Sequence, residues 1–435
     1  MLSVGAKIRP ASSDAKGDEV RKPGVKERRF GLWLAAAMTV APAAQITAQP
    51  LSWTSPGSDG TLSVRSIITA DADCPVAEAD GVALPMRPRA AAEAGFPVLV
   101  CEARVPFTTK KLAVAGSPTP VLPEEVRRIV VIGDTGCRLE GHAIQDCNDP
   151  QAWPFSALAL RAASHKPDLV VHVGDYYYRE APCPAERAGC AGSPNGDIWA
   201  TWQADFFAPA APLLSAAPWV MVRGNHELCS RGGRGWRHLL DPHLASADCA
   251  ARSDPYGLHL GGLDLLLLDS ADADDFSAPT EKVSAYAAQL EGLLKTAPPH
   301  AWLLTHRPIW AMAQGKLAGQ TLNATLQAAI RGHVPPGLDL VLSGHLHDFT
   351  SYEFGPERPA QLIVGDSGDT MLPLGKTPLI GAEIDGIKVR KAFALERFGF
   401  FVLERTQAEW TGTLYDSNDA VLARCQLSGR ALACR

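Results

Sequence analysis

The 435-residue sequence lacks several features that would place it in other protein classes. It has no C-x-x-C pair, which argues against a zinc site built on cysteine. It has no basic segment with interleaved aromatic residues, so we expect no nucleic-acid partner. The apolar run at residues 30–44 is shorter than the roughly 20 residues that span a bilayer, which argues against a permanent membrane anchor.

What the N-terminus does contain is the pattern of an export signal. A polar, basic stretch ends in Arg28 and Arg29, and the apolar run and several small residues follow it. This order predicts that residues 1–48 are an export signal with a preceding disordered segment, cut between Ala41 and Ala48. The arginine pair leaves the export route open. We therefore expect a periplasmic or extracellular protein with no stable membrane anchor after signal removal.

Loss of this segment makes the remaining chain more acidic. The segment carries eight Lys or Arg and four Asp or Glu, so the net charge changes from −6 to −10. A protein with this balance has no overall electric field that gathers polyanions.

All ten cysteines lie after the export signal. An even number of cysteines in an exported protein predicts disulfides. Sequence alone leaves the connectivity open, although the spacing suggests sequential pairs. These pairs are Cys74–Cys101, Cys137–Cys147, Cys183–Cys190, Cys229–Cys249 and Cys425–Cys434.

Two domains are expected from the distribution of apolar residues. Residues 52–117 alternate and are rich in turns, which predicts a small β-rich N-terminal domain. In residues 126–435, continuous apolar runs suit strands buried on both faces. Helical segments at residues 155–164 and 283–295 separate some runs, as is typical of α/β architectures, and the closer spacing of the later runs indicates partly antiparallel pairing. The runs lie at residues 129–132, 169–173, 219–222, 263–268, 302–304, 338–342, 362–364 and 400–403.

Side chains of metal-binding type follow most of these runs directly. Strand ends are rigid, so the pattern predicts one metal site built from many of them. Neighbouring glycines allow close approach of the backbone. Carboxylate, phenolate and imidazole donors suit iron, manganese or zinc. The segments are Gly133-Asp134-Thr135-Gly136, Gly174-Asp175-Tyr176-Tyr177-Tyr178, Gly224-Asn225-His226-Glu227, His306 and Gly344-His345-Leu346-His347.

The order of these segments resembles that of the calcineurin-like metallophosphoesterases and, more narrowly, the purple acid phosphatases. All five patterns of the subfamily occur within about residues 126–370. They are D-x-G, G-D-x-x-Y, G-N-H-[DE], an isolated histidine and G-H-x-H. The general family has a histidine ligand where this chain has Gly136. The subfamily replaces that ligand with a tyrosine three residues after the second aspartate, where Tyr178 stands.

The resemblance implies an α/β fold of the α+β type, with two packed mixed β-sheets flanked by helices in a catalytic domain at residues 126–435. It also implies a binuclear metal centre. Ferric iron would be bound by Asp134, Tyr178 and His347, and zinc, iron or manganese by Asn225, His306 and His345. Asp175 would bridge the two ions, and His226 would lie beside them as general acid or substrate orienter.

The reaction implied by the resemblance is attack of a metal-bound hydroxide on a small phosphate monoester. A pair of ions stabilises both the attacking and the leaving oxygen of such a displacement. A phosphodiesterase on the same metal core is the first alternative. A non-catalytic cell-envelope binding protein that retained the fold is an alternative of another class. The oligomeric state is not predicted.

Two further sets of residues carry weaker expectations. The glycine-rich loop after the third segment contains Arg231, Arg234 and Trp236, which could hold phosphate or frame a cleft, with a solvated loop as the alternative. Tyr176 and Tyr177 are expected to pack in the core.

A third set is acidic. Asp272, Asp274 and Asp275 lack the glycine and acidic spacing of an EF-hand, so we expect a solvated turn there.

Three of the predicted disulfides directly follow ligand segments. They are Cys137–Cys147, Cys183–Cys190 and Cys229–Cys249. Our hypothesis is that these bonds fix the rim of the metal site as well as stabilising the fold.

Overall fold

A computed structural model describes residues 50–435 except 142, 244–248, 314–316 and 408. The predicted export signal at residues 1–48 therefore lies outside the described residues. Among the described helices, none combines the length and the hydropathy needed to cross a membrane.

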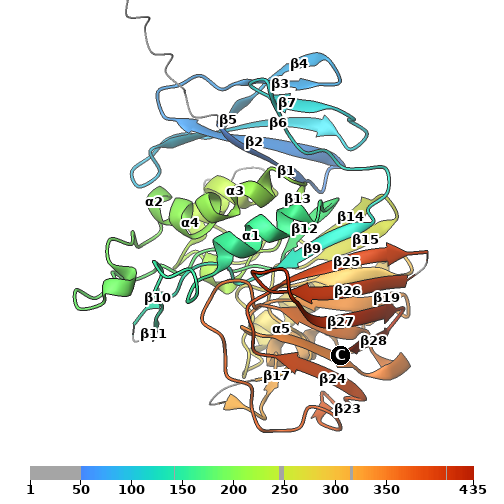
Figure 1. Ribbon diagram of the computed structural model, residues 1–435. Helices are drawn as coiled ribbons and strands as arrows, with labels where there is room; N and C mark the ends of the chain where they lie inside the picture. Colours follow the sequence, from blue (N-terminus) through green and yellow to red (C-terminus); the bar gives the residue numbers. More distant parts are fainter. Residues whose placement is uncertain (1–49, 142, 244–248, 314–316, 408) are drawn as a thin grey trace, which may run out of the picture. The chain divides into compact units, whose positions relative to one another are not determined.

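The apolar runs form two seven-stranded mixed sheets (Figure 1). The first has the order β13 (Trp219–Met221), β12 (Leu169–His172), β9 (Arg128–Ile132), β25 (Phe400–Thr406), β26 (Glu409–Tyr415), β27 (Val421–Ser428) and β28 (Ala431–Cys434). The second has the order β14 (Tyr256–Leu260), β15 (Leu263–Leu267), β16 (Ala301–Leu304), β19 (Leu338–Ser343), β21 (Ala360–Val364), β20 (Phe349–Glu353) and β24 (Lys391–Leu395).

Parallel pairing involves three strands at one end of the first sheet and four central strands of the second. In the first sheet β9, β12 and β13 run parallel, with Val131 and Val220 opposite Val171. In the second sheet β15, β16, β19 and β21 run parallel. The remaining strands pair antiparallel, which confirms the mixed sheets predicted from the sequence; they are β25–β28 in the first sheet and β14, β20 and β24 in the second.

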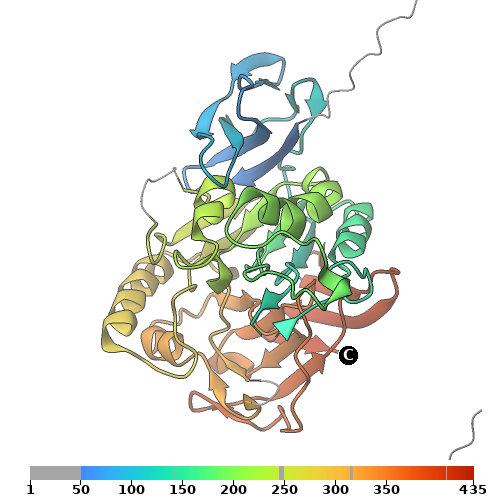
Figure 2. The same ribbon diagram turned by 90° about the vertical axis from the view of Figure 1, so that its left-hand side faces the viewer.

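Successive residues of the central strands are buried on opposite faces of each sheet. Val131 belongs to the cluster between the two sheets, whereas Val130 packs towards helices α1 (Phe155–Ser164) and α3 (Ala208–Leu214). On the second sheet, Leu303 faces α5 (Thr280–Lys295) and α6 (Ala324–Ile330). In Figure 2, the green helices that pack on the first sheet are separate from the yellow helix α5, which packs on the second. Burial on both faces explains why these strands read as continuous apolar runs.

The shorter elements connect and flank the two sheets. They are β10 (Leu139–Glu140), β11 (Ala143–Ile144), η1 (Ala188–Cys190), α2 (Trp199–Trp202), η2 (Gln203–Phe207), η3 (Asn225–Glu227), α4 (Gly233–Gly235), η4 (Trp236–Leu240), β17 (Ala311–Met312), β18 (Thr321–Leu322), η6 (Gly355–Glu357), β22 (Glu383–Ile384) and β23 (Ile387–Lys388).

The N-terminal region forms two four-stranded antiparallel sheets. Their orders are β1 (Leu51–Pro56), β2 (Thr61–Thr69), β6 (Val98–Pro106), β5 (Arg87–Ala90), and β4 (Val82–Pro85), β3 (Val76–Ala79), β7 (Leu112–Val114), β8 (Ser117–Pro118). The buried side chain of Arg65 joins this region to the segment after the third ligand motif, because it donates to the carbonyls of Leu239 and Asp241. The division into separate domains at residues 52–117 and 126–435 stays a prediction.

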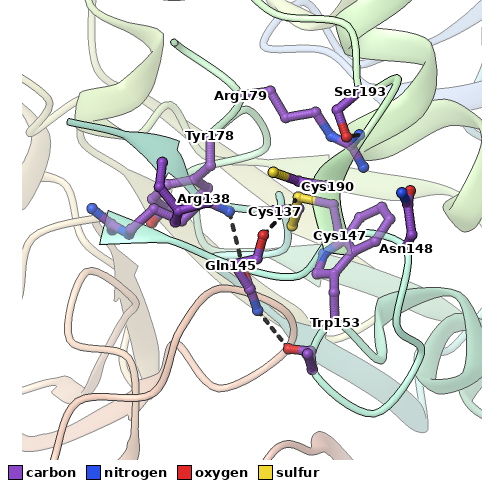
Figure 3. Close-up of a disulfide and its surroundings, with 12 residues drawn as sticks. Cys137, Arg138, Gln145, Cys147, Asn148, Trp153, Tyr178, Arg179, Cys190 and Ser193 are labelled. Carbon is purple, nitrogen blue, oxygen red and sulfur yellow. Dashed lines mark hydrogen bonds between the residues drawn. A yellow bond between two sulfur atoms is a disulfide. The ribbon is translucent and has the colours of Figure 1, made fainter. Parts of the chain in front are cut away.

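Five disulfides join the cysteines in the sequential order that the spacing suggests. Cys137–Cys147 and Cys183–Cys190 pack together with the buried side chain of Leu139. Figure 3 shows Cys190 close to Cys137 and Cys147. Cys425–Cys434 joins β27 to β28, at the edge of the first sheet opposite β13.

Candidate metal centre

The predicted ligands lie just after the ends of strands in both sheets. Asp134 lies two residues after β9, Asp175 three residues after β12, and His306 two residues after β16. Asn225 begins η3, which follows β13, and His345 lies two residues after β19. Parallel strands bring their carboxyl ends to one edge of a sheet, so side chains from distant segments converge there.

One group of donors surrounds the hydroxyl oxygen of Tyr178. This atom lies 3.0 Å from Oδ1 of Asp134, 2.8 Å from Oδ2 of Asp175 and 3.1 Å from Nε2 of His347. Nε2 of His347 is itself 3.5 Å from Oδ1 of Asp134. All four side chains are buried, so their donor atoms face one another rather than solvent.

A second group surrounds Nε2 of His306. This nitrogen lies 3.1 Å from Oδ1 of Asn225 and 3.1 Å from Oδ2 of Asp175. One ring nitrogen of His345 is within 4.8 Å of the donor atoms of Asp175 and His306. Oδ2 of Asp175 therefore belongs to both groups, and the structure brings all seven predicted ligands together in the division that the resemblance implies.

The two aspartates differ in how readily they ionise. Burial, together with the neighbouring charge of Asp175, raises the pKa of Asp134 well above its usual range. Burial also opposes ionisation of Asp175, but the imidazoles of His306 and His226 outweigh it and hold the pKa of Asp175 well below its usual range. Two carboxylates this close to each other share protons unless cations compensate their charge, so the pair is suited to binding cations.

Backbone carbonyls orient two of the ligand histidines. Nδ1 of His306 lies 2.9 Å from the carbonyl oxygen of Val173, and Nδ1 of His347 lies 3.0 Å from that of Thr370. A carbonyl only accepts hydrogen bonds, so each ring carries its proton on Nδ1 and a lone pair on Nε2. Both Nε2 atoms face the oxygen donors, as metal-binding histidines commonly do.

The backbone is strained where it presents the ligands. The φ angles of Asp134, Asp175 and His345 are +54°, +59° and +72°, in the left-handed region. The N–H of His345 donates to Oδ2 of Asp134 at 3.0 Å, which favours this conformation. At Gly224, a Cβ atom would lie 2.1 Å from Oδ1 of Asp175, so only glycine allows the two loops to approach.

Glu227 holds two ligand loops together, a role that we did not predict. Its fully buried carboxylate accepts hydrogen bonds from the backbone N–H groups of Gly224, Asp175 and Tyr176, at 2.9, 3.1 and 2.8 Å. The sequence signal for this role of Glu227 was its position at the end of the third motif.

Asp205 has a similar role for the Tyr178 segment. Its buried carboxylate accepts from the backbone N–H groups of Tyr178 and Cys137, at 2.9 and 3.1 Å, and pairs with Arg179. It lies in η2, far from every motif, and no local pattern marks it.

His226 stands against the Tyr178 group without joining it. Its ring centroid is 3.9 Å from that of Tyr178, and its Nε2 is 3.9 Å from Oδ2 of Asp175. Nδ1 of His226 lies 2.7 Å from Glu180 and 2.9 Å from Nη2 of Arg231. Burial lowers the pKa of His226 to about 3, so the ring is neutral in the protein alone. The same Nη2 of Arg231 lies 3.2 Å from Nε2 of His226, so the guanidinium faces both ring nitrogens.

Arg138 braces the opposite side of Tyr178. Its guanidinium carbon lies 4.8 Å from the ring centroid of Tyr178, and its Nε donates to the buried carboxylate of Asp369 at 3.0 Å. Oδ2 of Asp369 is 3.3 Å from Nδ1 of His347. Figure 3 shows Arg138 and Tyr178 beside the Cys137–Cys147 disulfide. Cys137 directly precedes Arg138 in the chain.

The two arginines of the glycine-rich loop have different neighbours. Arg231 lies beside His226 as described, whereas Arg234 contacts another loop, and a substrate contact for either arginine stays a prediction. Arg234 pairs with Glu93 at 3.1 Å and donates to the carbonyl of Ala94, and both residues lie in the loop between β5 and β6. Trp236 is 2% exposed and belongs to the core beside α3.

The expectation for the tyrosines agrees with the structure, whereas that for the acidic turn does not. Tyr176 stacks on His172 with ring centroids 3.8 Å apart, and Tyr177 stacks on Trp202. Asp275 is not a solvated turn residue, because it lies 2.9 Å from Nε2 of His345.

The donors fit a pair of transition-metal ions. Each group combines buried oxygen donors with imidazole nitrogen, and two of the three histidines are already held in the ligating tautomer. Phenol, carboxylate and imidazole together favour iron, manganese or zinc over calcium, which prefers oxygen alone. The identity of the ions stays a prediction.

Comparison with known proteins agrees with this geometry. The family model described as calcineurin-like phosphoesterase matches residues 127–349, more than half of the chain. Among curated proteins, none matches the sequence. The fold is similar to that of purple acid phosphatase PPD1 from yellow lupin (Lupinus luteus) seeds, with 14% identity, a TM-score of 0.59, and coverage of 87% of this chain and 74% of that one. It is also similar to the structure of PhoD, with 11% identity, a TM-score of 0.54, and coverage of 90% and 93%. The chain belongs to the calcineurin-like phosphoesterase family.

Proposed function

We propose that this protein is an exported acid phosphatase of the purple type that hydrolyses small phosphate monoesters. Membership of its family makes it a metal-dependent phosphoester hydrolase. The observation that carries the narrower proposal is the position of the Tyr178 hydroxyl, within 3.1 Å of Asp134, Asp175 and His347. A phenolate at this point is the donor that a ferric site needs once position 136 is glycine.

The residues are assigned to two ions. The first, ferric iron, would be held by Asp134, Tyr178 and His347, and the second, zinc, iron or manganese, by Asn225, His306 and His345, with Asp175 between them. When bound, the ions supply the positive charge that lowers the pKa of water and neutralises the phosphate.

The chain's own proton donor in this proposal is His226. Glu180 and Nη2 of Arg231 face Nδ1 of His226, and the same Nη2 lies 3.2 Å from Nε2. The role of general acid requires Nε2 to take up a proton, which the negative charge of a bound phosphate would favour. The N–H of His226 donates to Oδ1 of Asp175 at 2.8 Å, which fixes the ring relative to the bridging carboxylate. Arg231, 22% exposed in its side chain, is positioned to contact a phosphate oxygen at the same time.

Export is supported by the N-terminal pattern and by the disulfides. Five disulfides persist in an oxidising compartment and are rare in a reducing one. A small phosphoester in the periplasm or the medium is accordingly the proposed substrate.

The test is elemental analysis and a visible spectrum of the purified protein, followed by assays on a panel of mono- and diesters. We expect one iron and a second metal per chain, a phenolate-to-iron band, and faster hydrolysis of monoesters at acidic pH. Asn225→Ala should abolish hydrolysis, with exposed Asn418→Ala as the matched control. A colourless, iron-free enzyme would refute the purple assignment, and preference for diesters would favour the phosphodiesterase alternative.

A further inference from the structure

Asp275 stands behind a predicted metal ligand although no motif contains it. It lies in the segment between β15 and α5, and its Oδ2 is 2.9 Å from Nε2 of His345. Both side chains are largely buried, with 18% and 16% exposed. A short, buried contact between a carboxylate and an imidazole fixes the orientation of the ring.

The carboxylate of Asp275 is itself held on both oxygens. Oδ1 accepts from the side-chain amide of Asn323 at 3.1 Å, and Oδ2 accepts from Nη1 of Arg307 at 2.6 Å. The carbonyl of Asp275 also accepts the backbone N–H of Ala324, at 2.8 Å. Contacts from the start of α6 and from the end of β16 therefore determine where this carboxylate points.

Two side chains occupy Nε2 of His345. Oδ2 of Asp275 lies 2.9 Å from this nitrogen and Nη1 of Arg307 lies 3.0 Å from it. The carboxylate only accepts, so its contact favours the proton on Nε2 and the lone pair on Nδ1. With Asp275 and Arg307 both at Nε2, Nδ1 is the ring nitrogen left for the donor group of Asp175 and His306.

His345 thereby differs from the other two ligand histidines. Those rings donate Nδ1–H to a backbone carbonyl and present Nε2. His345 presents the opposite nitrogen, and the structure meets that requirement with a side-chain carboxylate.

We propose that Asp275, held by Arg307, is a positioning residue that presents Nδ1 of His345 to the second metal ion. This inference rests on the proposed binuclear site and extends it to residues outside the motifs. It concerns one ion only, because neither Asp275 nor Arg307 contacts the Tyr178 group in the described part of the chain.

The test compares Asp275→Asn with Asp272→Asn. Asp272 lies in the same segment and is also paired, with Arg252 at 2.7 Å and with Tyr286, but it does not contact a predicted ligand. Affinity for Zn²⁺ is measured by chelator competition, and the first site is followed by its visible band. We expect Asp275→Asn to bind the second ion about 10–100-fold more weakly and to keep the band of the first. Asp275→Glu should recover part of the loss, and Asp272→Asn should bind like the parent.

Arg307→Lys provides a second variant if Asp275→Asn does not fold. It keeps the charge but loses the planar fork that meets the carboxylate, so we expect a smaller loss confined to the same ion. Unchanged Zn²⁺ affinity in the folded variants, or equal weakening of both ions, would overturn the proposal. The Zn²⁺ titration requires neither iron nor hydrolysis, so a colourless parent protein would refute the purple assignment while leaving this comparison intact.

Discussion

A Cβ atom on Gly136 would lie 2.9 Å from Cδ2 of Tyr178, closer than side chains pack. Any side chain at position 136 would therefore displace the ring that reaches Asp134 and Asp175. The carbonyl oxygen of Tyr176 and the backbone nitrogen of Tyr178 would be equally close, at 2.9 Å. The Tyr178 ring and its own loop therefore occupy the space in which a side chain at position 136 would begin, which links the missing histidine to the added tyrosine.

Gly136→Ala should disturb the ferric site without unfolding the protein. The added methyl group overpacks the Tyr178 ring and is expected to destabilise the fold by about 1–3 kcal/mol. The visible band should weaken or shift in the spectrum of the reconstituted protein.

Tyr178→Phe should remove the visible band and most of the bound iron, because the hydroxyl is the proposed donor. Tyr177→Phe is the matched control, since this neighbouring tyrosine is also buried but packs on Trp202. Retention of the band in the Tyr178 variant would show that another group is the phenolate donor.

His226→Asn should slow hydrolysis by about 10²–10⁴-fold for alkyl phosphates, in the range of general acid–base catalysis. The loss should be smaller for aryl phosphates with good leaving groups, because these need little protonation. The readout is kcat across a leaving-group series, with His259→Asn, whose side chain is 75% exposed, as the control. An equal loss for all leaving groups would indicate that His226 orients substrate without moving a proton.

Replacing both cysteines of Cys137–Cys147 by serine should lower activity more than stability alone explains. The N–H of Cys137 and that of Tyr178 share the carboxylate of Asp205, so the disulfide constrains the ligand loop. The control is the same double replacement at Cys425–Cys434, whose separation of 9 residues nearly equals the 10 of the first pair. Both bonds restrict the unfolded chain alike. Full kcat in a folded Cys137/Cys147 variant would contradict the rim hypothesis.

We expect the free energy of unfolding to decrease as pH rises, because Asp366 is buried in its protonated form. This carboxyl is fully buried, and neither oxygen has a hydrogen-bond partner in the described part of the chain. Burial raises its pKa to about 8. Because the folded state then holds a proton that the unfolded state releases near pH 4, stability is greatest below that pH and declines up to about pH 8.

Each pKa unit corresponds to about 1.4 kcal/mol, so the decline is on the order of a few kcal/mol. Asp366→Asn should flatten the dependence of Tm on pH and raise Tm at pH 8, whereas exposed Asp71→Asn should not. An unchanged pH dependence would mean that Asp366 is ionised in the folded protein.

The sequence predicted the sheets well because burial on both faces leaves a local signature. Each apolar run overlaps a strand, and the helix expected at residues 155–164 has those bounds in the structure. The ligand residues were also recognisable, because each follows a strand within a few residues. The structure adds that they converge in two groups sharing Asp175.

The residues around the ligands could not be predicted in the same way. The pairing of Arg234 with Glu93, 141 residues away in the N-terminal region, had no local signal. Asp275 looked like a solvated turn residue, but it meets His345 at a separation of 70 residues.

What the sequence determined by itself was the strands and the order of donor side chains, since both depend on neighbouring residues. Only the tertiary structure decided which nitrogen of each histidine faces the site and which carboxylates hold the loops. Those choices depend on hydrogen bonds between segments that are distant in the chain, such as that from His306 to Val173, and no local pattern encodes such a contact.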